Sequence, residues 1–94
     1  MFEIQVVEQG LVRLTGRLDA SQSDHAQSVL AELHHSLTLD CAQLDYISSA
    51  GIGVLMETYK RLTARGQTVR LVNLLPRVRN VFAYAGLDRI FTIE

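Results

Sequence analysis

Two adjacent hydroxyls in the middle of the chain, Ser48 and Ser49, are the side chains best placed to do chemistry. They stand between an apolar, strand-like run that ends at Ile47 and a helical pattern that is strong from Ile52. A serine at a helix start can cap the unpaired backbone N–H groups there. It can also accept a phosphate, because the positive end of the helix dipole stabilises added negative charge. Both roles are open to this pair, since cap and acceptor can be adjacent residues.

Other chemistries find little support in the residues near these serines. Gly51 and Gly53 suggest a nucleotide loop, but position 56 is methionine instead of the third glycine of the dinucleotide fingerprint, and no P-loop lysine follows. A serine hydrolase would place a glycine where this chain has Ile47. His34 and His35 are adjacent, so on a helix they point about 100° apart and are poor joint metal ligands. We therefore expect no catalytic residue, no cofactor and no metal.

The elements that must position the serines follow from hydrophobic periodicity. Alternating apolar residues predict strands, and apolar residues at i, i+3, i+4 and i+7 predict helices. The expected strands are Phe2–Val7, Leu11–Thr15, Leu37–Cys41 (ending near Gln43), Thr68–Leu74 and Ile90–Ile93. The expected helices run from about Asp24 to Leu33 or Leu37, from the two serines to Arg65, and from Pro76 to Ala85.

This order, β-β-α-β-α-β-α-β, predicts one α/β domain over residues 1–94. The turn at Glu8–Gly10 makes the first two strands an antiparallel hairpin, and the helical crossovers favour parallel neighbours elsewhere. We expect a mixed sheet of about five strands, with three or more helices packed on at least one face.

Several side chains have expected places within these elements. Ser21 or Ser23 is expected to cap the first helix, and Cys41 to be a small buried hydrophobe. Asp19 is either a turn residue at a strand end or part of a partner surface. Five arginines are expected on solvated faces: Arg61, Arg65, Arg70, Arg77 and Arg79. Arg77 and Arg79, on the last helix, are also candidates for partner contact.

Composition excludes further classes of protein. Ninety-four residues, 48% of them hydrophobic, can form one domain with a real core. The net charge of −1, from nine basic and ten acidic residues, gives no electrostatic reason to expect nucleic acid or an anionic membrane surface as partner. No apolar run approaches the roughly 18–20 residues that span a bilayer, and no signal peptide is visible. We expect a cytoplasmic domain.

Four segments together resemble the STAS domain, and within it the anti-sigma factor antagonists of bacteria. The resemblance covers nearly the whole chain. Two of the segments are a strand that ends in Gly-x-Leu-Asp (14–19) and a central strand with the residues that leave it (39–47). The other two are a serine loop with the helix that follows (48–55) and a last helix with its terminal glycine (76–87). In the family the loop commonly has an aspartate, then a phosphorylated serine, a second hydroxyl and a glycine.

Alignment on Gly51 implies phosphorylation at Ser49, with Ser48 as second choice. Ser48 then stands where the family has its aspartate, and Ala50 where it has the second hydroxyl. The resemblance implies a partner switch in transcription regulation and signal transduction, with no enzymatic activity of its own. The unphosphorylated form would bind an anti-sigma factor that is a serine kinase of the histidine-kinase-like ATPase type, and a PP2C-type phosphatase would be a further partner. The expected partner-binding residues are Asp19, Ser48, Ser49, Ala50, Gly51 and Ile52.

Two alternatives stay open. STAS-like proteins also accompany transporters, including lipid-trafficking complexes, as constitutive subunits without a phosphorylation cycle, and the missing aspartate keeps that possibility. The other alternative, an enzyme of unknown type, is not supported by the residue inventory.

Overall fold

The structure is a computed structural model that describes all of residues 1–94, and its elements follow the predicted order β-β-α-β-α-β-α-β. The strands are β1 (Phe2–Glu8), β2 (Leu11–Leu18), β3 (Leu37–Ile47), β4 (Val69–Val72) and β5 (Thr92–Ile93). The helices are α1 (Ser23–Leu30), α2 (Ser49–Thr63) and α3 (Pro76–Tyr84), with 3-10 turns η1 (Ala20–Gln22) and η2 (Leu87–Arg89).

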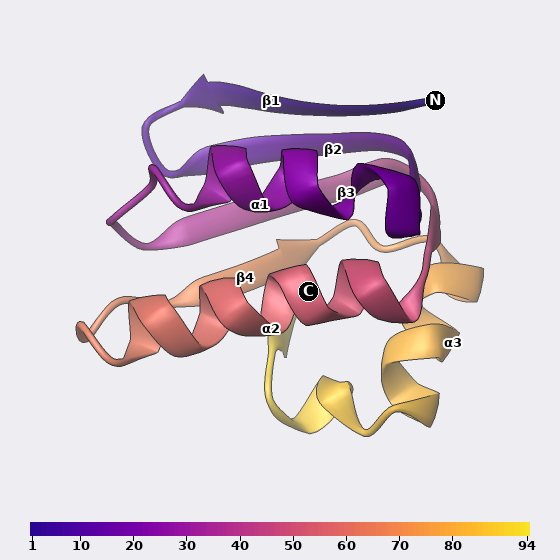
Figure 1. The fold of residues 1–94 in the computed structure, drawn as a ribbon. Coiled ribbons are helices and arrows are strands. Elements are labelled where there is room, and N and C mark those ends of the chain that lie inside the picture. The colour runs from indigo at the N-terminus through magenta and orange to yellow at the C-terminus, as the bar shows by residue number, and fades with distance from the viewer.

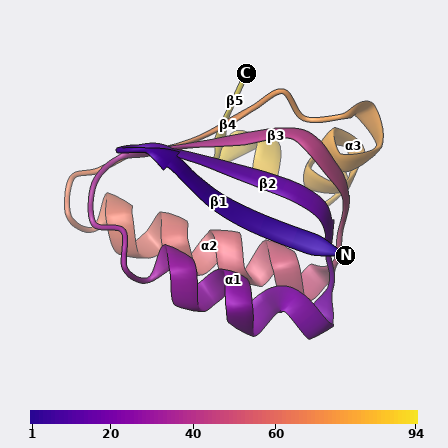
Figure 2. The ribbon, with the colours of Figure 1, turned by 90° about the horizontal axis from the view of Figure 1, so that it is seen from above.

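The five strands form one mixed sheet in the order β1-β2-β3-β4-β5. β1 pairs with β2 in antiparallel fashion, and every other neighbouring pair is parallel, which confirms the prediction. Figures 1 and 2 show α1 and α2 side by side on one face of the sheet, whereas α3 lies at the end of the sheet beside β3. The opposite sheet face carries no helix layer.

The hydrophobic core lies between the sheet and the two helices. Leu14, Leu39 and Leu71 from three neighbouring strands are fully buried, as are Leu30 of α1 and Leu55 of α2. The uncovered face of the sheet is polar instead and carries three ion pairs: Arg13–Asp40, Arg70–Glu94 and Arg77–Asp45. The sheet face that the helices cover is therefore apolar, and the face that is exposed to water is charged.

β3 is much longer than predicted, since it continues to Ile47 instead of ending near Gln43. Its pairing with β2 shifts register twice, between Arg13 and Thr15 and between Gly16 and Arg17 of the partner strand. Each irregularity places two exposed residues in succession in β3, so the alternation of buried and exposed residues breaks. A period of two cannot be followed through these points, and for this reason the prediction ended early. β2 likewise extends to Leu18, beyond the predicted Thr15.

α1 is shorter than predicted and ends at Leu30. Leu33 lies half-buried in the following loop and Leu37 is the first residue of β3, so their assignment to the helical face was wrong. The guanidinium of Arg61 donates to the carbonyl oxygens of Leu30 at 2.7 Å and Leu33 at 2.8 Å. The carbonyl oxygen of Leu30 also accepts from the N–H of Leu33 at 3.0 Å, so the guanidinium ties the end of α1 and the loop after it to α2. Arg61 is half-buried, which corrects its expected place on a solvated face.

The C-terminal third also departs from its predicted bounds. β4 ends at Val72, because Asn73 adopts a left-handed conformation with φ of 62° that interrupts an extended strand. Pro76 is the first residue of α3, as predicted, but Ala85 follows the helix and is exposed instead of lying on its apolar face. The residues that follow form η2, so the last strand is reduced to Thr92–Ile93.

Candidate functional site

The two serines lie at the carboxyl ends of two parallel strands. Leu18 of β2 and Ile47 of β3 are register partners, so the residues that follow them, Asp19 and Ser48, leave the sheet side by side. The backbone N–H of Ser48 donates to the carbonyl oxygen of Leu18 at 3.0 Å and continues the pairing one step beyond the strands. The structure thus brings Asp19 beside the serine loop, although 29 positions separate Asp19 from Ser48 in sequence.

Ser48 is the N-cap of α2. Its side-chain oxygen accepts a hydrogen bond from the N–H of Gly51 at 3.2 Å, and its hydroxyl donates to the carbonyl oxygen of Leu18 at 3.3 Å. A serine with extended backbone geometry at this position satisfies one of the unpaired N–H groups of the first helical turn. The hydroxyl of Ser48 is half-buried and occupied by these two contacts.

Ser49 is the first residue of α2 and is exposed. The side-chain hydrogen bonds of this turn all belong to Ser48, so the hydroxyl of Ser49 is free to react. The first intrahelical bond is donated by Ile52, which leaves the N–H groups of Ser49 and Ala50 without a partner in the helix. These two N–H groups and the helix dipole provide partial positive charge for an added phosphate.

The two glycines of the loop have different environments. A Cβ added to Gly51 would lie 2.8 Å from both Cγ and the carbonyl oxygen of Leu18, so only glycine lets α2 approach β2 this closely. A Cβ added to Gly53 would meet no atom within 4 Å. Gly53 therefore has no packing reason to be glycine within a helix, where it costs about 1 kcal/mol relative to alanine.

Asp19 has a structural role at this site. Its carboxylate accepts hydrogen bonds from the backbone N–H of Ser21 at 3.1 Å and from the Ser21 hydroxyl at 2.7 Å, and so caps η1. The hydrogen bond from the Ser21 hydroxyl holds the pKa of Asp19 below its usual range. Neither Ser21 nor Ser23, the predicted caps of α1, makes a capping hydrogen bond to that helix.

A shallow hollow of about 470 Å³ opens between α1 and α2 beside the serine loop. The predicted set of partner residues contained only one of its lining residues, Ala50. On α2 the lining residues Ala50, Gly53 and Glu57 are spaced i, i+3 and i+7, so they share one helical face. This spacing was the sequence signal that could have predicted the α2 side of the hollow. The α1 residues that line it, Ser23, Asp24 and Gln27, could be identified only once the packing of the two helices was known.

The six predicted partner residues do not all present surface. Ser49 is exposed, and Asp19, Ser48, Ala50 and Ile52 are half-buried. Gly51 is buried against β2. Their role in partner binding stays a prediction, in which Gly51 would act through the packing of α2.

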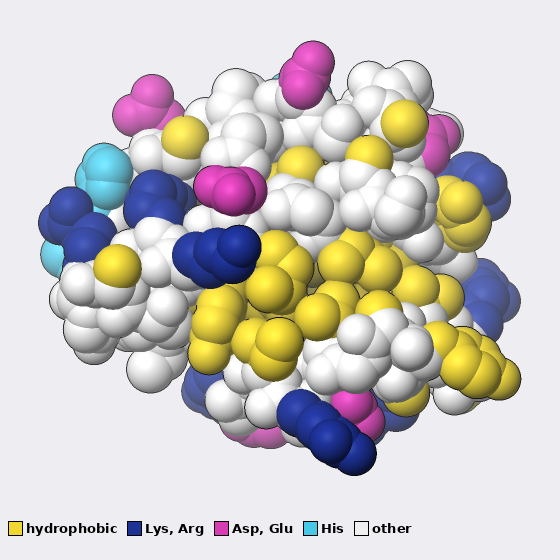
Figure 3. Space-filling view, turned by 60° about the horizontal axis from the view of Figure 1, so that its bottom comes forward, with side chains coloured by type: hydrophobic (Ala, Val, Ile, Leu, Met, Phe, Trp, Pro, Cys, Tyr) yellow, Lys and Arg dark blue, Asp and Glu magenta, His cyan; other side chains and the backbone are white.

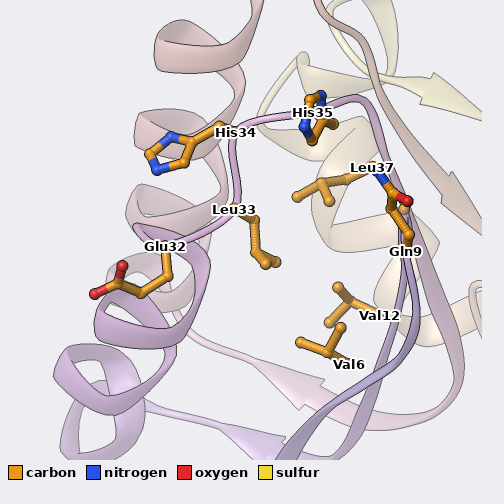
Figure 4. Close-up of a pocket in the computed structure, with 9 residues that line it drawn as sticks. Val6, Gln9, Val12, Glu32, Leu33, His34, His35 and Leu37 are labelled. Carbon is orange, nitrogen blue, oxygen red and sulfur yellow. The ribbon is translucent and has the colours of Figure 1, made fainter.

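A second hollow, of about 250 Å³, lies at the other end of the strands. Figure 4 shows Val6, Val12, Leu33 and Leu37 pointing into it, while the rings of His34 and His35 at its margin point in different directions. Metal-ligand side chains do not gather in groups of three or more in the structure. Cys41 is buried, as predicted, and burial raises the pKa of its thiol to about 12. None of the three helices is long and apolar enough to cross a membrane.

The fold and the serine turn define a class of small α/β domains in which a helix with a hydroxyl at its start follows the central strand of a mixed sheet. Residues 3–93 match the family described as "Mlab, STAS domain", and the chain belongs to the STAS domain family. This confirms the resemblance in the sequence.

Three proteins illustrate the similarity. A protein of Bordetella bronchiseptica assigned as the anti-sigma factor antagonist BtrV is 32% identical over 84 residues, which cover 85% of this chain and 72% of that protein. A Thermotoga maritima crystal structure assigned as an anti-sigma factor antagonist has a TM-score of 0.83 at 21% identity and covers 98% of this chain and 84% of its own. A sulfate transporter family protein of Wolinella succinogenes has a TM-score of 0.74 at 20% identity, with 92% and 75% covered. At these identities the two structures show the fold alone.

Proposed function

We propose that this protein is an anti-sigma factor antagonist that acts as a phosphorylation-controlled partner switch. The unphosphorylated form binds an anti-sigma factor that is also a serine kinase of the histidine-kinase-like ATPase type. Phosphorylation of Ser49 releases that partner, and a PP2C-type phosphatase restores the binding form. The protein acts by binding and catalyses nothing itself.

The observation that carries this proposal is the division of roles between the two serines. Ser48 caps α2 with its hydroxyl, whereas Ser49 is exposed and its hydroxyl has no partner. The acceptor can therefore be modified without loss of the cap that begins the helix. The relative assigned as an anti-sigma factor antagonist supports the kind of partner.

The size of the effect is sufficient for a switch. A phosphoserine carries about −1.5 to −2 charges at neutral pH. At the helix start the charge is tolerated by the fold, but a partner that covers Ser49 must desolvate it or clash with it. An uncompensated buried charge costs several kcal/mol, and each 1.4 kcal/mol weakens binding about tenfold. The open surface at Gly53 and the hollow beside it leave room for a kinase to approach.

The experiment incubates the protein with each purified anti-sigma factor kinase of the source organism and labelled ATP. We expect wild type to be phosphorylated, Ser49→Ala to lose the label, and Ser48→Asp to keep it, because aspartate also caps a helix. A pull-down with the same kinases should retain wild type and release Ser49→Asp. Equal labelling of Ser49→Ala would falsify the site assignment.

A second candidate function is a constitutive subunit of a transporter complex. It is favoured by Ser48, which replaces the family's aspartate next to the acceptor. The STAS fold of the Wolinella transporter family protein shows that this fold also serves transport proteins, and a fold does not by itself decide function. Co-purification with a membrane permease, unaffected by Ser49→Asp, would support this candidate and contradict the switch.

A further inference from the structure

One flank of α2, at the margin of the core, carries a stripe of three apolar residues that begins one turn after Ser49. Ile52, Met56 and Tyr59 follow Ser49 at spacings of three, four and three residues, so all four lie along one side of the helix. The three apolar side chains are only half-buried at the margin of the core. We call Ile52, Met56 and Tyr59 the α2 stripe.

The segment after β4 forms the other side of an apolar surface. The ring of Phe91 lies edge-on to Tyr59 at 5.2 Å and to Phe82 of α3 at 5.8 Å, so it joins the two helices. Val81 of α3 is half-buried, and Ile90 beside η2 is 40% exposed. Figure 3, turned so that the bottom of the Figure 1 view comes forward, shows a continuous hydrophobic patch with basic side chains at its edges and acidic side chains beside them.

A continuous apolar patch of this kind contrasts with the uncovered face of the sheet, where charged residues pair with one another. Scattered exposed hydrophobes are ordinary on a protein, but a contiguous patch rimmed by polar residues marks an interaction site. An apolar surface that extends over two helices is suited to the apolar face of an amphipathic helix.

We propose that the α2 stripe binds an amphipathic helix of the same regulator that recognises Ser49, and that this helix carries acidic residues along the borders of its apolar face. The inference rests on the proposed function and names the chemistry of the partner. Ile52 is one turn from Ser49, so a protein that covers the stripe also contacts the phosphate acceptor. Lys60, four residues after Met56, and Arg89, next to Ile90, are exposed and would pair with the acidic borders.

This arrangement explains why a phosphate at Ser49 would act as an off-switch. The phosphate dianion would lie at the end of an apolar interface. The bound partner would exclude water there, so the phosphate would lose its hydration on binding. Lys60 lies about three turns from Ser49 along α2, so the basic edge is too distant to neutralise the phosphate.

The test uses the anti-sigma factor kinase that phosphorylates Ser49 in the assay above. We expect Met56→Glu to weaken its binding by at least about 30-fold, as at a buried interface position. Lys60→Glu should weaken binding by about 3- to 10-fold, and the loss should shrink in high salt. Gln43→Glu, which adds the same charge at an exposed position of β3, is the matched control and should bind like wild type. Circular dichroism and urea unfolding verify that each variant is folded.

The two methionines of the chain provide an independent readout. With ¹³C-labelled methionine methyl groups, the resonance of Met56 should shift when the kinase is added, whereas that of Met1, 83% exposed and outside the patch, should not. A purely structural role of Met56 would not produce this difference.

Each remaining outcome is decisive. If Ser49→Asp is released but Met56→Glu binds like wild type, the switch stands and the docking inference is wrong. If no kinase binds or labels Ser49, the proposed function fails and the inference fails with it. If Met56→Glu abolishes self-association in sedimentation velocity but leaves kinase binding intact, the occupant is a second copy of this chain and the inference is also overturned.

Discussion

Ser48 accepts a hydrogen bond from the backbone N–H of Gly51 at 3.2 Å, and this contact fixes the start of α2. The hydroxyl of Ser48 donates in turn to the carbonyl oxygen of Leu18, so the helix start is tied to the end of β2. One serine is thereby committed to structure, and its neighbour Ser49 stays free at the surface. The adjacent hydroxyls differ in role because only one of them has the backbone geometry of a cap.

Removal of the cap should destabilise the fold, whereas removal of the free hydroxyl should not. We expect Ser48→Ala to lower the free energy of unfolding by about 1 kcal/mol, within the 0.5–2 kcal/mol range of helix caps. Ser49→Ala should change it by less than about 0.5 kcal/mol. Urea unfolding followed by circular dichroism measures both, and Ser48→Asp, which retains a cap, is the control. Equal losses in the two alanine variants would contradict the division of roles.

The two glycines of α2 should respond in opposite directions to alanine. Gly51→Ala places a Cβ 2.8 Å from the backbone oxygen of Leu18, so the helix must shift, at a cost of about 1–3 kcal/mol. Gly53→Ala meets open space and should stabilise the domain by up to about 1 kcal/mol through helix propensity. Thermal unfolding of the two variants beside wild type is the measurement. A destabilised Gly53→Ala variant would show that its surroundings are not open.

Phosphorylation of Ser49 should leave the domain folded. The phosphate would lie at the N-terminus of α2, beside unpaired N–H groups, where negative charge stabilises a helix by about 0.3–1 kcal/mol. Protein with phosphoserine incorporated at position 49 should therefore unfold at the same temperature as wild type or slightly higher. Loss of structure on phosphorylation would mean that release of the partner occurs by unfolding instead of at the contact surface.

Arg61 should contribute to stability through its two carbonyl contacts. Arg61→Met keeps much of the apolar stem but leaves the carbonyl oxygens of Leu30 and Leu33 without the guanidinium, and we expect a loss of about 1–3 kcal/mol. Arg65→Met, at an exposed position near the end of the same helix, is the matched control and should cost less than about 0.5 kcal/mol. The difference in urea midpoint between the two variants provides the test.

The thiol of Cys41 should be inert while the domain is folded. Burial raises its pKa to about 12, so at pH 8 almost none of it is the reactive thiolate. A disulfide reagent such as DTNB should label native protein slowly and guanidinium-unfolded protein rapidly. Rapid labelling in native buffer would indicate that β3 opens readily at this position.

Much of the fold could be predicted because its helices and hairpin are encoded locally. Pro76 and the apolar spacing around Val78 and Phe82 specify α3, and these residues occupy the expected places. β3 could not be bounded, because two register shifts against β2 break the alternation on which a strand prediction depends. The end of α1 was missed for a similar reason. Leu33 and Leu37 continue the apolar spacing of the helix, although Leu33 lies in the following loop and Leu37 begins β3.

The order of elements, the family resemblance and the serine pair could be predicted without the structure, because they depend on periodicity, local turn chemistry and motif residues. Which serine caps α2 became known from the packed fold, since the hydroxyl of Ser48 also contacts Leu18 on a neighbouring strand. The tertiary structure also shows that Gly51 packs and Gly53 does not. The contact between the α2 stripe and α3 through Phe91 also follows from tertiary packing, because residues distant in sequence meet only when the chain is folded.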